Sequence, residues 1–161
     1  MSEQSVVNAS PLIFLSKAGL IHLLQQAGQK VAVPETVANE ILRRGIKDIT
    51  AQVLEKTTWL SIVEVPLIPT VIQSWDLGPG ESSVLAYAHN NPGVITIIDD
   101  KAGRNCAETL GLPLLGTLGL VMIAKKRGLI PAARPLIALL KNRGMFLSES
   151  IIDQAMALIG E

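Results

Sequence analysis

Short apolar runs rich in β-branched residues alternate along this chain with longer segments of helical periodicity. A strand buried on both faces is brief and apolar, whereas a helix that covers a sheet repeats its apolar residues every three or four positions. Residues 94–98 give the strongest strand pattern, and residues 35–44 give the clearest helical one, with Gly45 as a stop. The predicted strands are residues 6–7, 31–34, 59–65, 94–98 and 112–115.

The predicted helices place apolar residues on one side and polar residues on the other. Leucines between Leu12 and Leu24 indicate two short helices with a break near Gly19, and residues 131–160 indicate two more, divided by Gly144. The remaining predicted helices are residues 35–44, 49–56, 81–88, a segment that ends at Leu110, and 118–127. Strands that alternate with helices in this way predict a three-layer α/β/α fold with a central, mostly parallel sheet.

The composition indicates one folded domain. Hydrophobic residues make up 48% of the chain and charged residues 17%, which excludes a disordered tail. No linker or repeat divides the sequence, so we expect residues 1–161 to form a single domain, with C-terminal helices from about 131 to 160. Lysine plus arginine and aspartate plus glutamate both number 14, so a basic groove for nucleic acid must be local.

The sequence also favours a reducing, aqueous compartment. Cys106 is the single cysteine, which excludes an internal disulfide and a cysteine-rich zinc site. Met1 to Ser5 are polar and show no basic segment leading into a long apolar one, so we expect no secretory signal. No apolar run approaches the roughly 18 residues of a membrane span. We therefore expect a soluble, cytoplasmic protein.

Oxygen-bearing side chains mark one edge of the predicted sheet. Asn8 ends the first strand, Asp99 and Asp100 end the strand at 94–98, and Glu81 opens the helix before that strand. Glu40 lies on the helix at 35–44, from which it could project over the same edge. Ligands bind beyond the carboxyl ends of parallel strands, and hard oxygen ligands favour Mg²⁺ or Mn²⁺ over zinc. Such an ion can activate water against a phosphodiester.

Four segments resemble the motifs of PIN domains in the order in which that family has them. They are Val6 to Ile13 with Asn8 and Ser10, Val33-Pro34 before the helix of Glu40, Gly78-Pro79-Gly80-Glu81, and Ile97 to Lys101. Residues 116–130 are similar to the tail of a compact prokaryotic branch of that family. The resemblance covers residues 6 to about 152.

The resemblance implies a metal-dependent single-strand ribonuclease, often the toxin of a toxin–antitoxin pair with a protein antitoxin as partner. By position, the metal-coordinating and catalytic residues are Asn8, Glu40, Glu81 and Asp100, with Asp99 as neighbour or alternative, and Ser10 supports the first ligand. Lys101 and Arg104, next to the acids, are the expected phosphate contacts. Apolar segments at 118–124 and 135–140 further suggest a homodimer.

The first position departs from the family pattern, which usually has aspartate there. Asn8 offers a neutral carbonyl oxygen and removes one negative charge. A second function therefore stays open, a catalytically degenerate PIN fold that binds RNA or a protein.

Structural roles for the same residues also stay open. Glu40 could be a solvated helix residue, and Glu81 could interact with the macrodipole of its helix. Asp99 or Asp100 could cap the next helix, and Asn8 with Ser10 could form a local turn.

Other chemistry is disfavoured. Cys106 lies in an apolar helical pattern, so we expect a core residue and not a nucleophile, and we expect His22 at the surface or an interface. The glycine-containing segments 78–80 and 116–119 match neither the P-loop nor the dinucleotide fingerprint.

Overall fold

A computed structural model describes residues 4–161 of the chain. The first three residues, part of the segment where we expect no secretory signal, lie outside the described residues. The strands are β1 (Ser5–Val7), β2 (Val31–Pro34), β3 (Leu60–Val63), β4 (Ile95–Ile97) and β5 (Leu114–Leu115). The helices are α1 (Ala9–Lys17), the 3-10 helix η1 (Ile21–Ala27), α2 (Glu35–Leu42), α3 (Ile49–Lys56), α4 (Thr70–Gln73), α5 (Pro79–Asn90), α6 (Lys101–Thr109), α7 (Thr117–Lys126), α8 (Arg134–Asn142) and α9 (Glu149–Ile159).

The five strands form one sheet in the order β3-β2-β1-β4-β5, and every neighbouring pair is parallel. In the centre, Val6 pairs with Ala32 of β2 and with Thr96 of β4. The chain moves outward from β1 to β2 and β3, and then returns to the other side of β1 with β4 and β5. The order therefore reverses between β1 and β4, where a crevice opens in such sheets.

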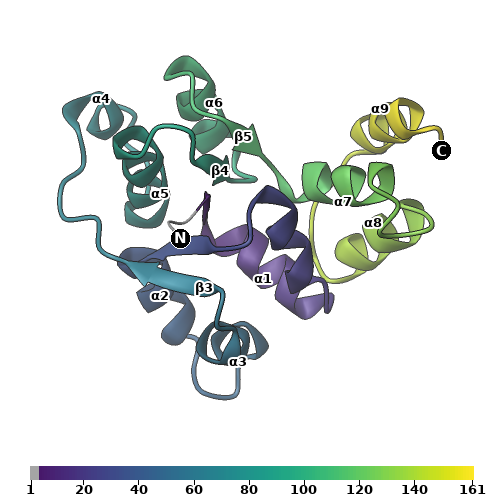
Figure 1. Ribbon diagram of the computed structural model, residues 1–161, viewed down its shortest axis with the longest axis horizontal. Helices are drawn as coiled ribbons and strands as arrows, with labels where there is room; N and C mark the ends of the chain where they lie inside the picture. The colour runs from purple at the N-terminus through teal and green to yellow at the C-terminus, as the bar shows by residue number, and fades with distance from the viewer. Residues whose placement is uncertain (1–3) are drawn as a thin grey trace.

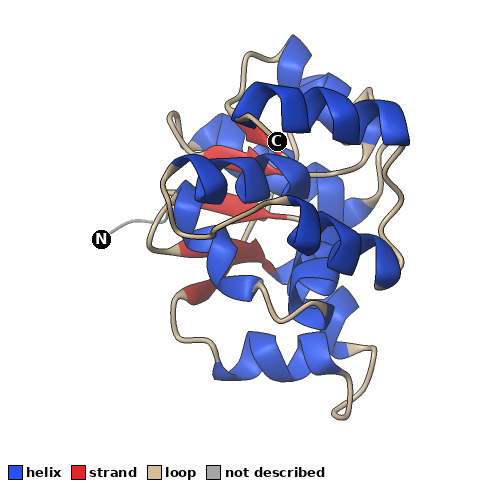
Figure 2. Cartoon of the chain, turned by 90° about the vertical axis from the view of Figure 1, so that its right-hand side faces the viewer, coloured by secondary structure: helices blue, strands red, loops and turns tan. Residues whose placement is uncertain are grey.

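Helices cover both faces of the sheet, as Figures 1 and 2 show. Helix α5 packs against β1, β2 and β4, with α6 beside it. On the other face η1 packs against β2 and α7, and α1 lies between η1 and α3. Helices α8 and α9 pack on α7 at the end of the molecule that holds the C-terminus (Figure 1). This arrangement confirms the predicted three-layer α/β/α fold.

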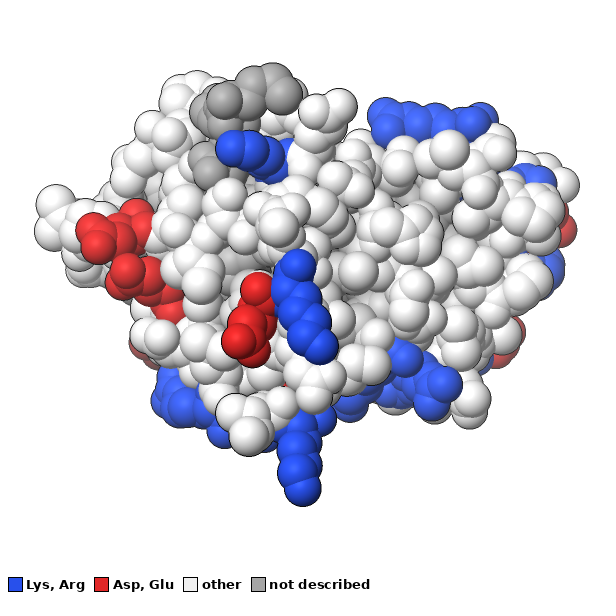
Figure 3. Space-filling model, turned by 60° about the horizontal axis from the view of Figure 1, so that its bottom comes forward, with Lys and Arg blue, Asp and Glu red and all other residues white. Residues whose placement is uncertain are grey.

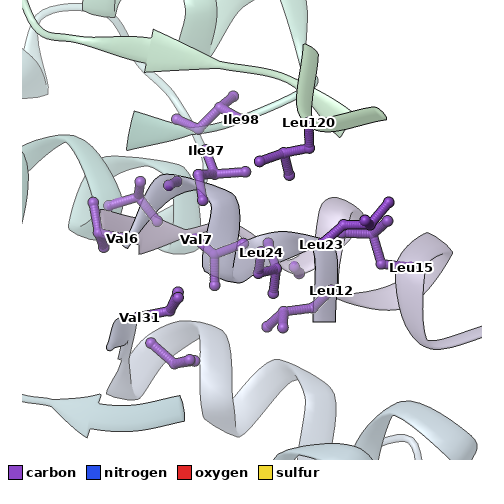
Figure 4. Close-up of a cluster of buried hydrophobic side chains, with 14 of the residues drawn as sticks. Val6, Val7, Leu12, Leu15, Leu23, Leu24, Val31, Ile97, Ile98 and Leu120 are labelled. Atoms are coloured by element: carbon purple, nitrogen blue, oxygen red, sulfur yellow. The ribbon is translucent and has the colours of Figure 1, made fainter. Parts of the chain in front are cut away.

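The core lies where both helical layers meet the central strands. Val7 and Ile97 are fully buried and lie on the same side of the sheet as Leu12 of α1 and Leu120 of α7, whereas Val6 is fully buried on the opposite side (Figure 4). Each large aliphatic side chain that is removed from water stabilises the fold by about 1.5 to 3 kcal/mol. A rigid core therefore underlies the loops that follow β1 and β4.

Several boundaries differ from those that the sequence predicts. The second short helix is the 3-10 helix η1, whose larger rise lets seven residues span about 14 Å where an α-helix would span about 10.5 Å. Helix α2 ends at Leu42, two residues early, because Gly45 has a φ of 103° and the chain turns before it. Helix α4 lies in a segment for which the sequence pattern predicts no helix or strand. None of the described helices is long and apolar enough to cross a membrane.

Candidate active site

The loops after β1 and β4 are tied together at the carboxyl edge of the sheet. Asn8 directly follows β1, and its backbone N–H donates to the carbonyl oxygen of Ile97 at 3.0 Å. Asn8 precedes the first turn of α1, its side chain caps no backbone N–H there, and the residue is only 6% exposed. Its amide is therefore held at the switch point of the sheet without a capping role.

A cleft of about 480 Å³ opens beside Asn8, between α2 and the first turn of α5. A β-carbon placed on Gly80 would lie 3.5 Å from Asn8 Oδ1 and 3.5 Å from Glu40 Oε2, so both oxygens face the same point. The residues that line the cleft are Asn8, Ala9, Ser10, Thr36, Glu40, Arg43, Gly78, Pro79, Gly80 and Glu81.

Glu81 connects this cleft to Asp100. Burial raises the pKa of the Glu81 carboxyl, and the charge of Asp100, a hydrogen bond with Asp100 and the charge of Glu40 raise it further. A hydrogen bond between two carboxyl groups needs a proton on one of them, and nearby negative charges favour that proton. A β-carbon on Gly103 would lie 3.5 Å from Glu81 Oε2, so the start of α6 closes this side.

The two adjacent aspartates serve different helices. Asp100 is the N-cap of α6, where Oδ2 accepts the Gly103 N–H at 3.1 Å. Asp99 accepts the N–H and the hydroxyl of Thr117, both at 2.7 Å, and so satisfies the start of α7. Asp100 therefore caps the helix that follows it directly, as the sequence allowed for one of the two, whereas Asp99 binds the first residue of α7, whose N-cap is Gly116. Of these two aspartates, only Asp100 contributes to the raised pKa of Glu81.

The model of the PIN domain family matches residues 4–161. The chain belongs to this family. PIN domains are generally nucleases that use divalent metal ions, and they typically act on RNA. A comparison with curated proteins gives no match.

The two basic residues that we expected to contact phosphate lie outside the cleft of this PIN domain. Arg104 Nη1 donates to the carbonyl oxygen of Ile98 at 3.1 Å, and a β-carbon on Gly116 would lie only 2.7 Å from it. Arg104 and Asp99 border a second cavity of about 430 Å³ against α7. Lys101 is exposed at the start of α6 and borders neither cavity.

Arg43 is a positively charged residue of the cleft that the PIN-like sequence motifs did not identify. It lies three positions after Glu40, follows the last turn of α2, and lines the cleft. Helical spacing from Glu40 was the available signal, since residues three apart are neighbours on a helix surface. The face shown in Figure 3 carries separate groups of basic and acidic side chains with uncharged surface between them.

A cavity larger than this cleft lies away from the acids. It measures about 710 Å³ and opens at the amino ends of β1 and β4, between Gly28 and Gly93. None of the described residues that line it is acidic or basic. We place the candidate site at the smaller cleft, because parallel sheets bind ligands at their carboxyl edge and because Glu40 and Glu81 line it.

Two residues outside the site have the placements that the sequence predicted. Cys106 is fully buried in α6, and burial raises the pKa of its thiol, which disfavours the reactive thiolate. His22 is exposed on η1.

The donor set of the PIN site fits a hard divalent cation. Its side-chain donors are carboxylate and amide oxygens, and no salt bridge among the described residues involves Glu40, Glu81, Asp99 or Asp100. Uncompensated carboxylates that raise the pKa of a neighbour are stabilised by a cation. Within residues 4–161, however, no group of three or more Asp, Glu, His or Cys side chains is already close enough to hold a metal ion.

Proposed function

We propose that this PIN domain is a metal-dependent endoribonuclease that cuts single-stranded RNA in the cytoplasm and acts as one domain. The observation that carries the proposal is the convergence of Asn8, Glu40 and Glu81 on one cleft, with Asp100 hydrogen-bonded to Glu81. This cleft lies at the sheet edge where the order of strands reverses.

Each residue has a stated role in this proposal. Asn8, Glu40, Glu81 and Asp100 hold Mg²⁺ or Mn²⁺, and Ser10 supports Asn8 from the half-buried start of α1. When bound, the ion lowers the pKa of a water molecule and stabilises negative charge on a phosphodiester. Asp99 is left out of this ligand set, because both of its oxygens accept hydrogen bonds from Thr117 and it does not line the cleft.

The test is cleavage of unstructured RNA in Mn²⁺, with a chelator as control. Glu40→Gln and Glu81→Gln should each abolish cleavage, since each removes a ligand charge. Glu35→Gln is a matched control, because Glu35 lies in the first turn of the same helix and does not line the cleft. Absence of cleavage across several RNAs, by a folded wild-type protein, contradicts the proposal.

The proposal includes the toxin half of a toxin–antitoxin pair, with a protein antitoxin as partner. Its support is membership of the PIN family, in which, as the resemblance implies, many proteins are toxins of such pairs. Induced expression in a bacterium should arrest growth, and Glu81→Gln should relieve the arrest at equal protein level. If wild type and Glu81→Gln arrest growth equally, the arrest does not depend on the candidate site, and the toxin proposal is contradicted.

A homodimer is also proposed, at a surface other than the one that the sequence suggested. Only some of the apolar residues at 118–124 and 135–140 are in the core, among them Leu120 and Ile137, and the others are half-buried or exposed. Leu42 and Ile62, by contrast, are 49% and 53% exposed and line one cavity beside the edge strand β3. Sedimentation should show a dimer that Ile62→Lys dissociates, since charge on an edge strand opposes pairing. A wild-type monomer at micromolar concentration contradicts it.

A second function is favoured by Asn8 itself. A neutral amide at the first ligand position weakens the hold on a cation, so the fold could bind RNA without cutting it. RNA binding that persists in chelator, together with no cleavage in Mn²⁺, would identify this binding module.

A further inference from the structure

The candidate cleft is larger than a metal ion requires. An ion with six waters occupies about 200 Å³, at about 30 Å³ per water, whereas the cleft measures about 480 Å³. Small-molecule sites begin at about 300 Å³. The remaining space can hold part of the substrate, and the side chains on its wall can contact it.

Arg43 is the single lysine or arginine among the described residues that line this cleft. Its Nε donates to the carbonyl oxygen of Asn39 at 3.2 Å, one turn earlier in α2, which directs the guanidinium. It takes part in no salt bridge among the described residues. The charge of Arg43 therefore lies on the wall of the cleft that Glu40 and Glu81 also line, and no salt bridge among the described residues neutralises it.

The two residues that the sequence predicted as phosphate contacts, Arg104 and Lys101, do not line the cleft. Arg104 donates to the carbonyl oxygen of Ile98 and borders the cavity against α7, and Lys101 lines neither that cavity nor the cleft. The neighbouring Arg44 pairs with Asp48 at 3.1 Å and does not line the cleft.

We infer that Arg43 is the substrate-binding residue that holds an RNA phosphodiester next to the metal-binding acids. The inference rests on the proposed function for the identity of the substrate. A guanidinium offers two parallel N–H donors to two phosphate oxygens, which fixes the orientation of the group as well as its position. Arg43 thus replaces Lys101 and Arg104 in the role that the sequence gave to them.

The test measures binding of a labelled single-stranded RNA of about 12 nucleotides in chelator, over a series of salt concentrations. Arg43→Gln should weaken binding about tenfold, the size of one charge-assisted contact. It should also reduce the slope of log K against log salt by about 0.7, the value for one lost phosphate contact on a single strand. Arg43→Lys should keep the slope and lose part of the affinity.

Arg44→Gln is the matched control, with the same change one residue away, and should leave affinity and slope unchanged. In Mn²⁺, Arg43→Gln should raise KM and leave the Mn²⁺-induced rise in Tm intact. Equal effects of Arg43→Gln and Arg44→Gln would overturn the inference while leaving the proposed nuclease in place. Absence of RNA binding by the wild type also overturns it. Binding that depends on Arg43, without cleavage, would sustain it and refute the nuclease.

Discussion

Replacing Asn8 with aspartate tests the metal site without knowledge of the RNA. Asn8 Oδ1 and Glu40 Oε2 each lie 3.5 Å from one point, so they are at most about 7 Å apart. A new charge at that separation is repelled by about 0.6 kcal/mol in a water-like dielectric and about 2.4 kcal/mol at an effective dielectric constant of 20. Because Asn8 is buried, we expect metal-free Asn8→Asp to be about 1 to 2 kcal/mol less stable than wild type.

Mn²⁺ should offset this loss of stability, because the added charge attracts the cation that Glu40 and Glu81 also face. A tenfold tightening of metal affinity adds up to about 1.4 kcal/mol of stability at saturating metal. For a chain of this size, 1 kcal/mol changes Tm by about 2 to 4 °C. The Mn²⁺-induced rise in Tm should therefore be about 3 to 6 °C larger in the variant.

The assay is thermal unfolding of wild type and Asn8→Asp, each in Mn²⁺ and in chelator. Asn105→Asp is the matched control, since Asn105 is exposed on α6 and does not line the cleft. It should shift Tm little and leave the response to Mn²⁺ unchanged. If Asn8→Asp shows no larger response to Mn²⁺ than wild type, Asn8 is not a metal ligand and the catalytic proposal loses its first residue.

Three further predictions follow from the contacts of the acids and of the core. The pKa of Glu81 is raised above 4.5 in the folded protein, so in chelator its contribution is favourable below pH 4.5 and is lost as pH rises through the folded pKa. Glu81→Gln should therefore gain stability over wild type as pH increases, and a constant difference in urea midpoint from pH 4 to 8 would contradict this. Asp99→Asn should lower stability by about 1 to 3 kcal/mol, because it weakens both bonds to Thr117, yet retain the response of Tm to Mn²⁺. If Asp99→Asn lost the response of Tm to Mn²⁺, Asp99 would be identified as a metal ligand. Finally, Met156 of α9 belongs to the same core cluster as the sheet, so near-UV and far-UV signals should show one coincident unfolding transition, and two separate transitions would divide the proposed single domain.

Local periodicity was sufficient to predict most of the fold. The β-branched run at 94–98 indicated β4, and the apolar spacing at 35–44 indicated α2, because each pattern reflects which face of an element is buried. The sequence could not indicate the order β3-β2-β1-β4-β5, which depends on contacts between strands far apart in the chain. It also missed α4, whose four residues are too few for a period to appear.

The sequence by itself determined which acids the candidate site could contain. The end of the first strand at Asn8 and the start of a helix at Glu81 are both marked by local changes in residue type. Only the tertiary structure distinguished the role of Asp99 from that of Asp100. The two are neighbours with the same chemistry, and they differ because Thr117, 18 positions later, binds both oxygens of Asp99. The structure likewise brought Arg43 into the cleft and left Arg104 bonded to Ile98 outside it. Which cation faces the cleft depends on how α2 and α6 pack around the sheet, and a one-dimensional pattern does not contain that geometry.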